Sequence, residues 1–257
     1  IDLQITRYAK GDISSYPASW THTPGDETLV NAFDAACLAR ARAPLELEKR
    51  YMSLFGALLH ASKFRPEISA ALGLLGTCLT FATEDLYECM MRVLVYLGRT
   101  KTLGVTFSKH VAGASKLKVF ADSNWATTRS VSGFTFILAG GNVSHASRRQ
   151  HCISMSSCEA ELIALADAAI ELLHVRSLLE FIGHEFDGPV EVATDNKAAF
   201  DLCHRFTSAQ NSRHIDRKLF KMRELRGAGL GTVSHVPTEF NPADLFTKIL
   251  SRQPFEK

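Results

Sequence analysis

The spacing of apolar residues changes near Lys101, and this change limits the chain to a helical part followed by a part that contains strands. Over residues 45–98, apolar residues recur three and four positions apart, which is the pattern of amphipathic helices. After Lys101, short apolar runs are separated by turn residues, which predicts strands. With 257 residues, the chain is long enough for one large domain or two small ones.

Beyond residue 101 the predicted elements follow a definite order. Several apolar runs have the length of strands, and Gly140 with Gly141 predicts the turn of a hairpin. The expected strands are residues 104–108, 116–122, 131–138, 142–147, 189–194 and 232–236, and the expected helices are residues 156–183, 197–205, 213–228 and 241–250. Antiparallel strands followed by alternating helices and strands predict a mixed α/β domain.

The expected domain organisation has three parts: an irregular N-terminal arm over residues 1–44, a helical segment over 45–108 and an α/β domain over 109–257. The arm is interrupted by proline and glycine and is too weakly patterned to bury a core alone, although its Ala-rich residues 31–42 are a candidate helix. In the helical segment, Pro66 is expected to open one helix. Thr83, which precedes two acidic residues, is expected to cap the next helix.

Composition limits the possible functions without choosing one. The net charge of +2 is too small to predict nucleic-acid binding, so such affinity would have to come from local clusters of Lys and Arg. Six cysteines without zinc-type spacing predict buried thiols in a reducing intracellular compartment, whether cytoplasm, nucleus or organelle. No apolar run reaches the length of a membrane span, so no membrane partner is expected. The start at Ile1 predicts a fragment or a processed product.

The expected helix over residues 156–183 contains one residue that helix formation does not explain. Ser156 and Glu159 have the spacing of a capping box, which gives Glu159 a structural role. Glu161 instead falls near the centre of the apolar stripe, which is formed by Leu165, Ala168, Leu172, Val175 and Leu179. A carboxylate that points at a core is costly unless it is paired, protonated or bound to a metal. Glu161 is therefore the main candidate for chemistry in this helix.

Three aspartates lie in comparable positions at the ends of predicted elements. Asp122 and Asp195 each end a strand, and Asp244 lies in the first turn of the last helix, with Asn241 as its expected cap. Each alone has an ordinary explanation as a turn residue or as a charge favoured at a helix N-terminus. Together with Glu161 they offer four hard oxygen ligands, and no Cys/His cluster competes with them. The set predicts a site for Mg²⁺ or Mn²⁺.

Seven motifs occur in order between residues 120 and 248. They are F-A-D-S-N-W-A at 120–126, R-S-V-S-G-F at 129–134, S-R-R-Q at 147–150, S-M-S-S-C-E-A-E-L-I-A-L-A-D-A-A-I-E at 154–171, T-D-N-K-A-A at 194–199, R-H-I-D-R-K-L-F-K-M-R-E at 213–224 and H-V-P-T-E-F-N-P-A-D-L-F-T-K at 235–248. In order and spacing they resemble the ribonuclease H domain of Ty1/copia-type LTR retrotransposon Pol polyproteins. The runs at 51–60 and 83–98 resemble the thumb- or connection-like segment of the same polyproteins.

The resemblance implies a ribonuclease H-like fold, a mixed five-stranded sheet with flanking helices. It assigns the family's catalytic and metal-binding acids to Asp122, Glu161, Asp195 and Asp244. The implied reaction is endonucleolytic hydrolysis of the RNA strand of RNA–DNA hybrids by two Mg²⁺ or Mn²⁺ ions, as part of a reverse transcriptase. The polymerase motif Y-x-D-D does not occur in the sequence, so this chain alone is not expected to synthesise DNA. Asn124 stands where the family often has a second aspartate.

Basic and polar residues indicate where RNA or an RNA–DNA hybrid would bind. The expected contacts are Arg148, Arg149, Asn196, Arg213, His214, Arg217, Lys218 and Lys221. A basic helix face would give salt-dependent affinity without sequence preference. Ordinary alternatives remain, since the basic set can be a solvated helix face, Asn196 can cap the following helix and His214 can pack against its neighbours. Trp125 is expected in the core rather than as a surface for stacking bases.

Two other functions are compatible with the sequence. In one, a host has retained this retrotransposon-derived domain as a structural or RNA-binding subunit of a ribonucleoprotein assembly, and catalysis is lost or unused. In the other, the chain is a different nuclease of the same fold, such as a resolvase or transposase, which fits the acids but not the motifs. The expected partners are accordingly other parts of a Pol polyprotein or of a host assembly.

Overall fold

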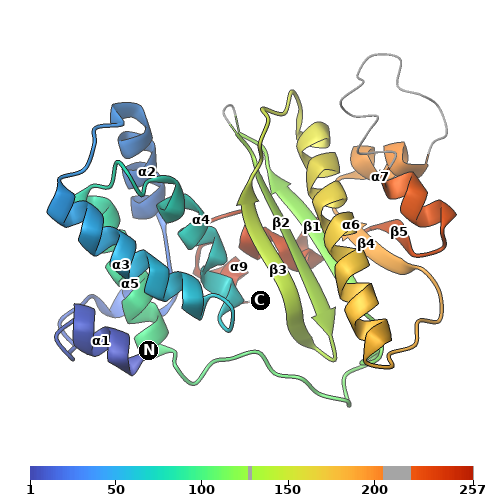
Figure 1. Ribbon diagram of the computed structural model, residues 1–257, viewed down its shortest axis with the longest axis horizontal. Helices are drawn as coiled ribbons and strands as arrows, with labels where there is room; N and C mark the ends of the chain where they lie inside the picture. The colour runs from blue at the N-terminus through green and yellow to red at the C-terminus, as the bar shows by residue number, and fades with distance from the viewer. Residues whose placement is uncertain (127–128, 205–220, 257) are drawn as a thin grey trace. The chain divides into compact units, whose positions relative to one another are not determined.

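The change in apolar spacing near residue 101 lies close to the boundary between two units in the computed structural model, which describes residues 1–126, 129–204 and 221–256 (Figure 1). The helical unit comprises Ile1–Val105 and Lys248–Lys257. The α/β unit comprises Thr106–Thr247. The last ten residues of the chain therefore group with the helical unit and not with the sheet.

The helical unit is built around three helices that share one core. Its elements are α1 (Asp2–Tyr8), η1 (Ala18–Thr21), α2 (Glu27–Ala39), α3 (Leu45–Ala61), η2 (Pro66–Ile68), α4 (Ser69–Thr77), α5 (Glu84–Arg99) and α9 (Arg252–Phe255). Tyr51 and Leu54 of α3, Leu75 of α4 and Leu94 of α5 are fully buried together. The Tyr51 hydroxyl donates to the carbonyl oxygen of Leu75 at 2.9 Å. The helices predicted from apolar spacing after residue 45 are thus confirmed.

The first 44 residues are not the irregular arm that the sequence predicts. They contain α1 and α2, which place Ile5 and Leu29 in the core of the helical unit. Arg99, at the end of α5, donates to the carbonyl oxygens of Ile13 and Tyr16 at 2.8 and 2.7 Å. The candidate helix over residues 31–42 corresponds to the larger part of α2. The prediction of an irregular arm was wrong because the segment packs against α5, which is distant in sequence, and a local pattern contains no information on such packing.

Thr83 caps α5 as predicted, since its hydroxyl accepts a hydrogen bond from the Leu86 N–H at 3.2 Å. We expect Thr83→Ala to lower the free energy of unfolding by about 1 kcal/mol, because one N–H at the helix start loses its acceptor. Thr83→Ser should retain most of the stability. Urea unfolding followed by circular dichroism measures the difference, with Thr80→Ala at a nearby exposed position as the control. Equal losses in both alanine variants would contradict the capping role.

The α/β unit contains one mixed sheet of five strands in the order β3-β2-β1-β4-β5, as the resemblance implied. Its elements are β1 (Lys118–Asn124), β2 (Val131–Leu138), β3 (Gly141–Arg149), α6 (Ser157–Phe181), β4 (Val190–Thr194), α7 (Lys197–His204), β5 (Gly231–His235), η3 (Thr238–Phe240) and η4 (Pro242–Phe246). Strands β1, β2 and β3 are antiparallel, whereas β4 pairs parallel with β1 and with β5. The hairpin turn is confirmed, with Gly140 at a φ of +81°, where glycine is favoured.

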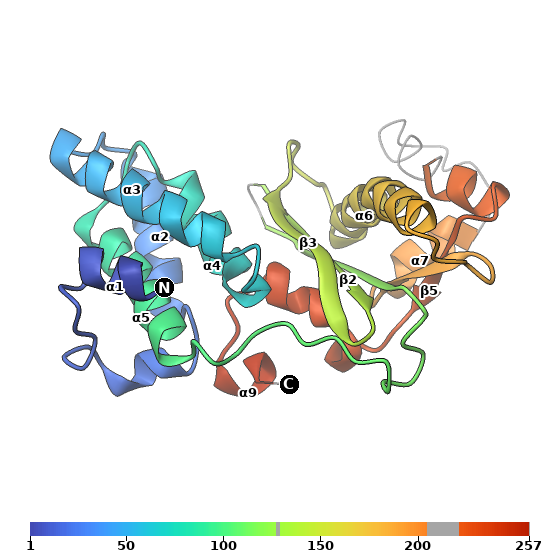
Figure 2. The ribbon, with the colours of Figure 1, turned by 60° about the horizontal axis from the view of Figure 1, so that its bottom comes forward.

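The helices α6 and η4 cover opposite faces of the sheet near β2 (Figure 2). Alternate residues of a strand point to opposite faces. Phe134 belongs to the apolar core that includes Leu165 of α6. Its neighbour Gly133 faces η4, because a Cβ atom added there would lie 2.6 Å from Thr247 Cγ2 and 2.8 Å from Phe246 Cβ. Gly133 therefore allows η4 to lie directly on the strand.

Two predicted elements differ from the structure. Residues 104–108 are not a strand. Ser108 donates its N–H to the carbonyl oxygen of Ala139 at 2.7 Å, and Phe107 covers Gly141 at the hairpin turn. The predicted last helix, 241–250, is only the short 3₁₀ helix η4, although Asn241 caps it as expected by accepting from the Ala243 N–H at 3.2 Å. In both cases apolar residues pack on β2 and β3 instead of extending a regular element.

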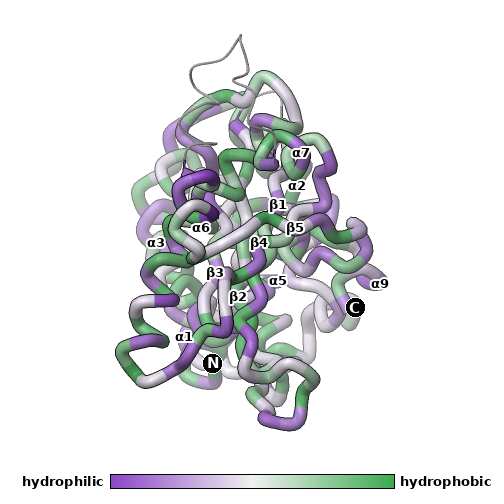
Figure 3. Tube along the Cα trace, turned by 90° about the vertical axis from the view of Figure 1, so that its right-hand side faces the viewer, coloured by the Kyte–Doolittle hydropathy of each residue, from purple (hydrophilic) through white to green (hydrophobic). Residues whose placement is uncertain are grey.

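Hydrophobic and hydrophilic stretches alternate along the chain (Figure 3). Among the helices in the described part of the chain, none combines the length and apolar content that crossing a bilayer requires.

Candidate metal centre

Two parallel strands separate at the point where the predicted acids lie. Strands β1 and β4 pair only at Val119 with Val192 and at Phe120 with Ala193. Beyond these pairs, β1 continues to Asp122, and β4 ends one residue before Asp195. The carboxyl ends of parallel strands at such a divergence are the usual place for ligands in α/β folds, and this place is called the crevice below.

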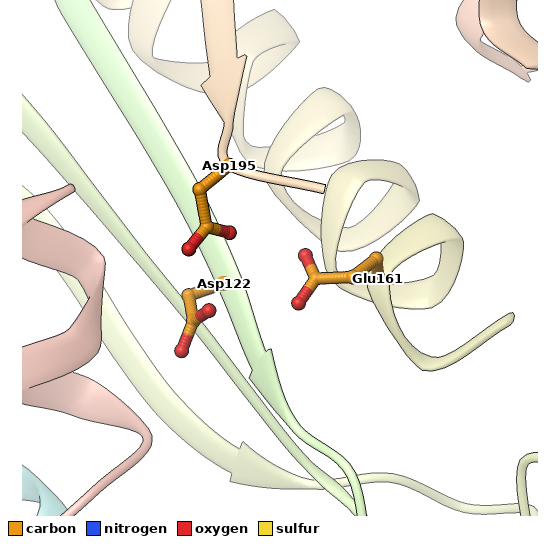
Figure 4. Close-up of side chains that lie close together, drawn as sticks. All are labelled: Asp122, Glu161 and Asp195. Carbon is orange, nitrogen blue, oxygen red and sulfur yellow. The ribbon is translucent and has the colours of Figure 1, made fainter. Parts of the chain in front are cut away.

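Three of the four predicted acids converge in this crevice. Asp122 comes from β1, Asp195 follows β4 and Glu161 projects from the second turn of α6, with the side chains of Asp195 and Glu161 extending toward Asp122 (Figure 4). One oxygen of each lies within 4.8 Å of the others. Asp122 and Glu161 are 2% and 4% exposed, and Asp195 is half-buried. Three carboxylate oxygens without nitrogen or sulfur donors fit a hard divalent cation.

Glu161 lies on the buried face of α6, as its place in the apolar stripe predicted. Leu165, Ala168 and Leu172 share that face and are fully buried. Ser156 accepts from the Glu159 N–H at 3.2 Å, and Glu159 accepts from the Met155 N–H at 2.8 Å. The two glutamates therefore have different roles, because one fixes the start of α6 and the other enters the crevice.

Residues from both strands hold the Glu161 carboxylate in place. Ser123 donates its backbone N–H and its hydroxyl to Glu161 Oε1, both at 3.0 Å. Thr194 of β4 donates its hydroxyl to Glu161 Oε2 at 3.3 Å. Each donor directly neighbours a crevice aspartate in sequence, so the two strands that supply Asp122 and Asp195 also orient Glu161.

Burial, together with a nearby like charge, changes the ionisation of Glu161. Burial, and secondly the nearby Asp122 carboxylate, raise the pKa of Glu161 to about 8, against the effect of the Ser123 hydrogen bonds, which favour the charged form. A raised pKa from desolvation and like charge is common at functional sites. A cation in the crevice would favour ionised Glu161.

The two residues that flank η4 support Asp122 and its neighbour Ala121 from the other face of the sheet. Thr247 donates its hydroxyl to Asp122 Oδ2, and the Asn241 side-chain amide donates to the carbonyl oxygen of Ala121 at 3.1 Å. Asp244 lies in η4, but it is not one of the three acids whose oxygens lie within 4.8 Å of one another. The role of Asp244 as a fourth ligand stays a prediction.

Sequence reasoning missed the structural role of Gln150, the last residue of S-R-R-Q. Its buried side-chain amide donates to Ser132 Oγ on β2 at 2.9 Å and to the carbonyl oxygen of Ala160 on α6 at 3.0 Å. Its Oε1 accepts from the Ser154 hydroxyl at 2.7 Å. Gln150 therefore joins the sheet, the loop before α6 and the first turn of the helix that carries Glu161.

The structure describes four of the eight predicted nucleic-acid contacts. Arg148 is exposed on β3, Arg149 is half-buried, and Lys221 forms an ion pair with Glu224 at 3.2 Å. Asn196 accepts from the Ala199 N–H at 3.0 Å and so caps α7, which is the ordinary alternative. The other predicted contacts, Arg213, His214, Arg217 and Lys218, lie outside the described residues.

Trp125 is not in the core, contrary to the expectation from sequence. Its side chain is 48% exposed, and its indole Nε1 donates to the carbonyl oxygen of Ser154 at 3.1 Å. The expectation failed because β1 ends at Asn124, so the next residue leaves the sheet.

If the crevice binds a divalent ion, Ser123→Ala is expected to weaken Mn²⁺ binding by about 10- to 100-fold, because Glu161 loses a donor that orients it. Isothermal titration calorimetry of the purified protein with Mn²⁺ measures the change. Ser144→Ala is a matched control, since Ser144 donates to Glu171 at 2.6 Å on the same helix but outside the acidic group. Equal affinities of Ser123→Ala and the unmodified protein would contradict the positioning role of Ser123.

Relatives of the chain include retrotransposon polyproteins. It is 30% identical over 210 residues to "Retrovirus-related Pol polyprotein from transposon RE2" of Arabidopsis thaliana, covering 80% of this chain and 14% of that protein. It is 28% identical over 234 residues to the Pol polyprotein from transposon TNT 1-94 of Nicotiana tabacum, covering 85% and 17%. It is also 36% identical over 126 residues to "Secreted RxLR effector protein 161" of Plasmopara viticola, covering 47% of this chain and 87% of that protein. The chain thus spans between about one seventh and one sixth of the length of these Pol polyproteins. No family model matches it.

Solved structures with partial likeness include two nucleic-acid complexes. LC11-RNase H1 in complex with RNA/DNA hybrid matches 51% of this chain and 94% of its own at 17% identity and a TM-score of 0.40. The foamy viral protease-reverse transcriptase in complex with double-stranded DNA matches 83% of this chain and 35% of its own at 12% identity and a TM-score of 0.43.

Proposed function

Because this chain is homologous to a segment of Ty1/copia-type Pol polyproteins, we propose that its α/β unit hydrolyses the RNA strand of RNA–DNA hybrids. The observation that carries the proposal is the convergence of Asp122, Glu161 and Asp195 where β1 and β4 separate. A structural subunit that no longer catalyses would not need a buried carboxylate cluster, which is costly without a cation.

We propose that the three acids hold a pair of Mg²⁺ or Mn²⁺ ions, which when bound would lower the pKa of an attacking water and stabilise the leaving oxygen. Asp122 is held by Thr247, and Glu161 is held by Ser123 and Thr194. Preorganised ligands lose little freedom when cations bind, which favours affinity. Asp195 is the most exposed of the three, so we place it nearest the substrate phosphate. We further propose Asp244 as a fourth ligand.

The proposed substrate and partners follow from the same homology. Arg148, Arg149 and Lys221 would contact phosphates of the hybrid together with the four predicted residues outside the described part of the chain. Asn196 would contact a ribose 2′-hydroxyl, which distinguishes RNA from DNA. Other parts of a Pol polyprotein are the proposed protein partners. All six cysteines are free thiols, which supports a reducing intracellular location.

The proposal is tested with purified protein, Mg²⁺ and three end-labelled duplexes of one sequence: RNA–DNA, RNA–RNA and DNA–DNA. We expect cutting of the RNA strand of the hybrid only, with products that carry a 5′-phosphate and a 3′-hydroxyl. Binding of hybrid or structured RNA by folded protein without any cutting would contradict the enzyme function and favour the structural or RNA-binding alternative. Cutting of DNA–DNA instead would favour a nuclease of another class.

A further inference from the structure

Trp125 is a large apolar side chain that is both exposed and fixed in position. It directly follows β1, three residues after Asp122, and 48% of it is exposed. The hydrogen bond from its Nε1 to the carbonyl oxygen of Ser154 holds the indole against the loop before α6. Exposed aromatic side chains that are already ordered lose little entropy on binding, so they are effective contact surfaces.

Two further apolar side chains lie in the same loop. Ile153 and Met155 are 59% and 85% exposed, whereas Ser154 between them is 3% exposed. Ser154 is bound to Gln150, and Gln150 is bound to Ala160 in the first turn of α6. The loop that holds the indole is therefore anchored to the helix that carries Glu161.

Positive charge borders this position on β3 and just before β2. Asn124, the residue before Trp125, pairs with Val131 of β2, and Val131 pairs with Arg149 of β3. Arg129, two residues before Val131, is exposed. The acidic crevice lies further back along β1, since Asp122 precedes Asn124 by two residues on this strand. Exposed apolar groups next to arginines and a metal-binding site match the sugars, bases and phosphates of a nucleic acid better than an uncharged partner.

We propose that Trp125, Ile153 and Met155, here called the Trp125 surface, bind nucleotides of the hybrid next to the scissile phosphate. The inference rests on the proposed function. Three residues of extended chain span about 10 Å, so the Trp125 surface lies within reach of a duplex whose scissile phosphate is at the crevice. The wide, shallow minor groove of an A-form-like duplex exposes ribose and base edges to such side chains. The Trp125 surface therefore positions the substrate and takes no part in the reaction itself.

Steady-state cleavage of the hybrid by the full chain tests the surface. Trp125→Ala is expected to raise KM about tenfold, the scale of one lost base–aromatic contact, with kcat within about twofold. Trp125→Phe should restore most of the affinity. The control is Phe181→Ala, which removes an 87% exposed aromatic residue at the far end of α6. A KM equal to that of the unmodified protein in Trp125→Ala would overturn the inference.

A binding experiment separates this inference from the proposed function. The chain has two tryptophans, so 5-fluorotryptophan labelling gives two ¹⁹F resonances, which Trp125→Phe assigns. In an Asp195→Asn background, saturating hybrid should shift the Trp125 resonance and protect it from a soluble paramagnetic quencher. Binding of the hybrid without any change at Trp125 would overturn the inference, whether or not the unmodified protein cleaves. A shift without cleavage by the unmodified protein would contradict the proposed function alone.

Discussion

Asp195→Asn is expected to lower the rate of hybrid cleavage by about a thousandfold or more while the fold remains intact. The amide has nearly the same shape, but it removes a negative charge and an anionic ligand from the proposed metal centre. The variant should fold because Asp195 is only half-buried and because its loss relieves repulsion among three carboxylates within 4.8 Å. Initial cleavage rates with Mg²⁺ and thermal unfolding without metal measure the two effects.

The control for this variant is Asp187→Asn, which removes an exposed carboxylate from the loop before β4. It should cleave at the normal rate. Cleavage by Asp195→Asn within about tenfold of the unmodified protein would show that Asp195 does not take part in the reaction, since a lost metal ligand costs far more.

The stability of the unmodified protein is expected to fall as pH rises, and Glu161→Gln is expected to remove most of this fall. In the folded metal-free protein the pKa of Glu161 is about 8, whereas in the unfolded chain it is about 4.3. Between these values the folded state holds a proton that the unfolded state releases, so stability falls as pH rises through this window. A pKa difference of this size corresponds to at most about 5 kcal/mol of stability. Thermal unfolding in EDTA at pH 5 and pH 8 should show the fall in the unmodified protein and little of it in Glu161→Gln.

A divalent metal should reverse this dependence, because it binds the ionised carboxylate and stabilises the folded state more as pH rises. Glu161→Gln should lose this gain and cleave the hybrid no better than Asp195→Asn. Glu171→Gln is the matched control, since Glu171 lies on the same helix and accepts from Ser144 outside the acidic group. An equal fall in stability in Glu161→Gln and in the unmodified protein would contradict the raised pKa.

Local periodicity predicted the parts of the site that lie within single elements. The apolar stripe of one helix distinguishes Glu161, which lies on it, from Glu159, which does not. The helix indeed buries Glu161. Asp122 and Asp195 were identified from strand ends, and parallel pairing of β1 with β4 brings these ends together. The order of strands and helices was also sufficient to predict a mixed α/β fold.

Features that depend on packing between distant segments could not be predicted in this way. Gln150 gains its role only when β2, the loop before α6 and α6 itself surround its amide. The exposure of Trp125 depends on where β1 ends. The need for glycine at position 133 becomes evident only from the packing of η4 against it. Spacing within one segment contains no information on such contacts, which explains why Trp125 was expected in the core.

The most direct test of the proposed metal centre is the anomalous scattering of a crystal of the chain grown with Mn²⁺. We expect anomalous density between the carboxylates of Asp122, Glu161 and Asp195, at about 2.0–2.5 Å from their oxygens, and no such density in Asp195→Asn. Density at this position would establish the three acids as metal ligands and would show whether Asp244 joins them. A well-ordered crevice without anomalous density, at Mn²⁺ concentrations that support cleavage, would contradict the metal centre.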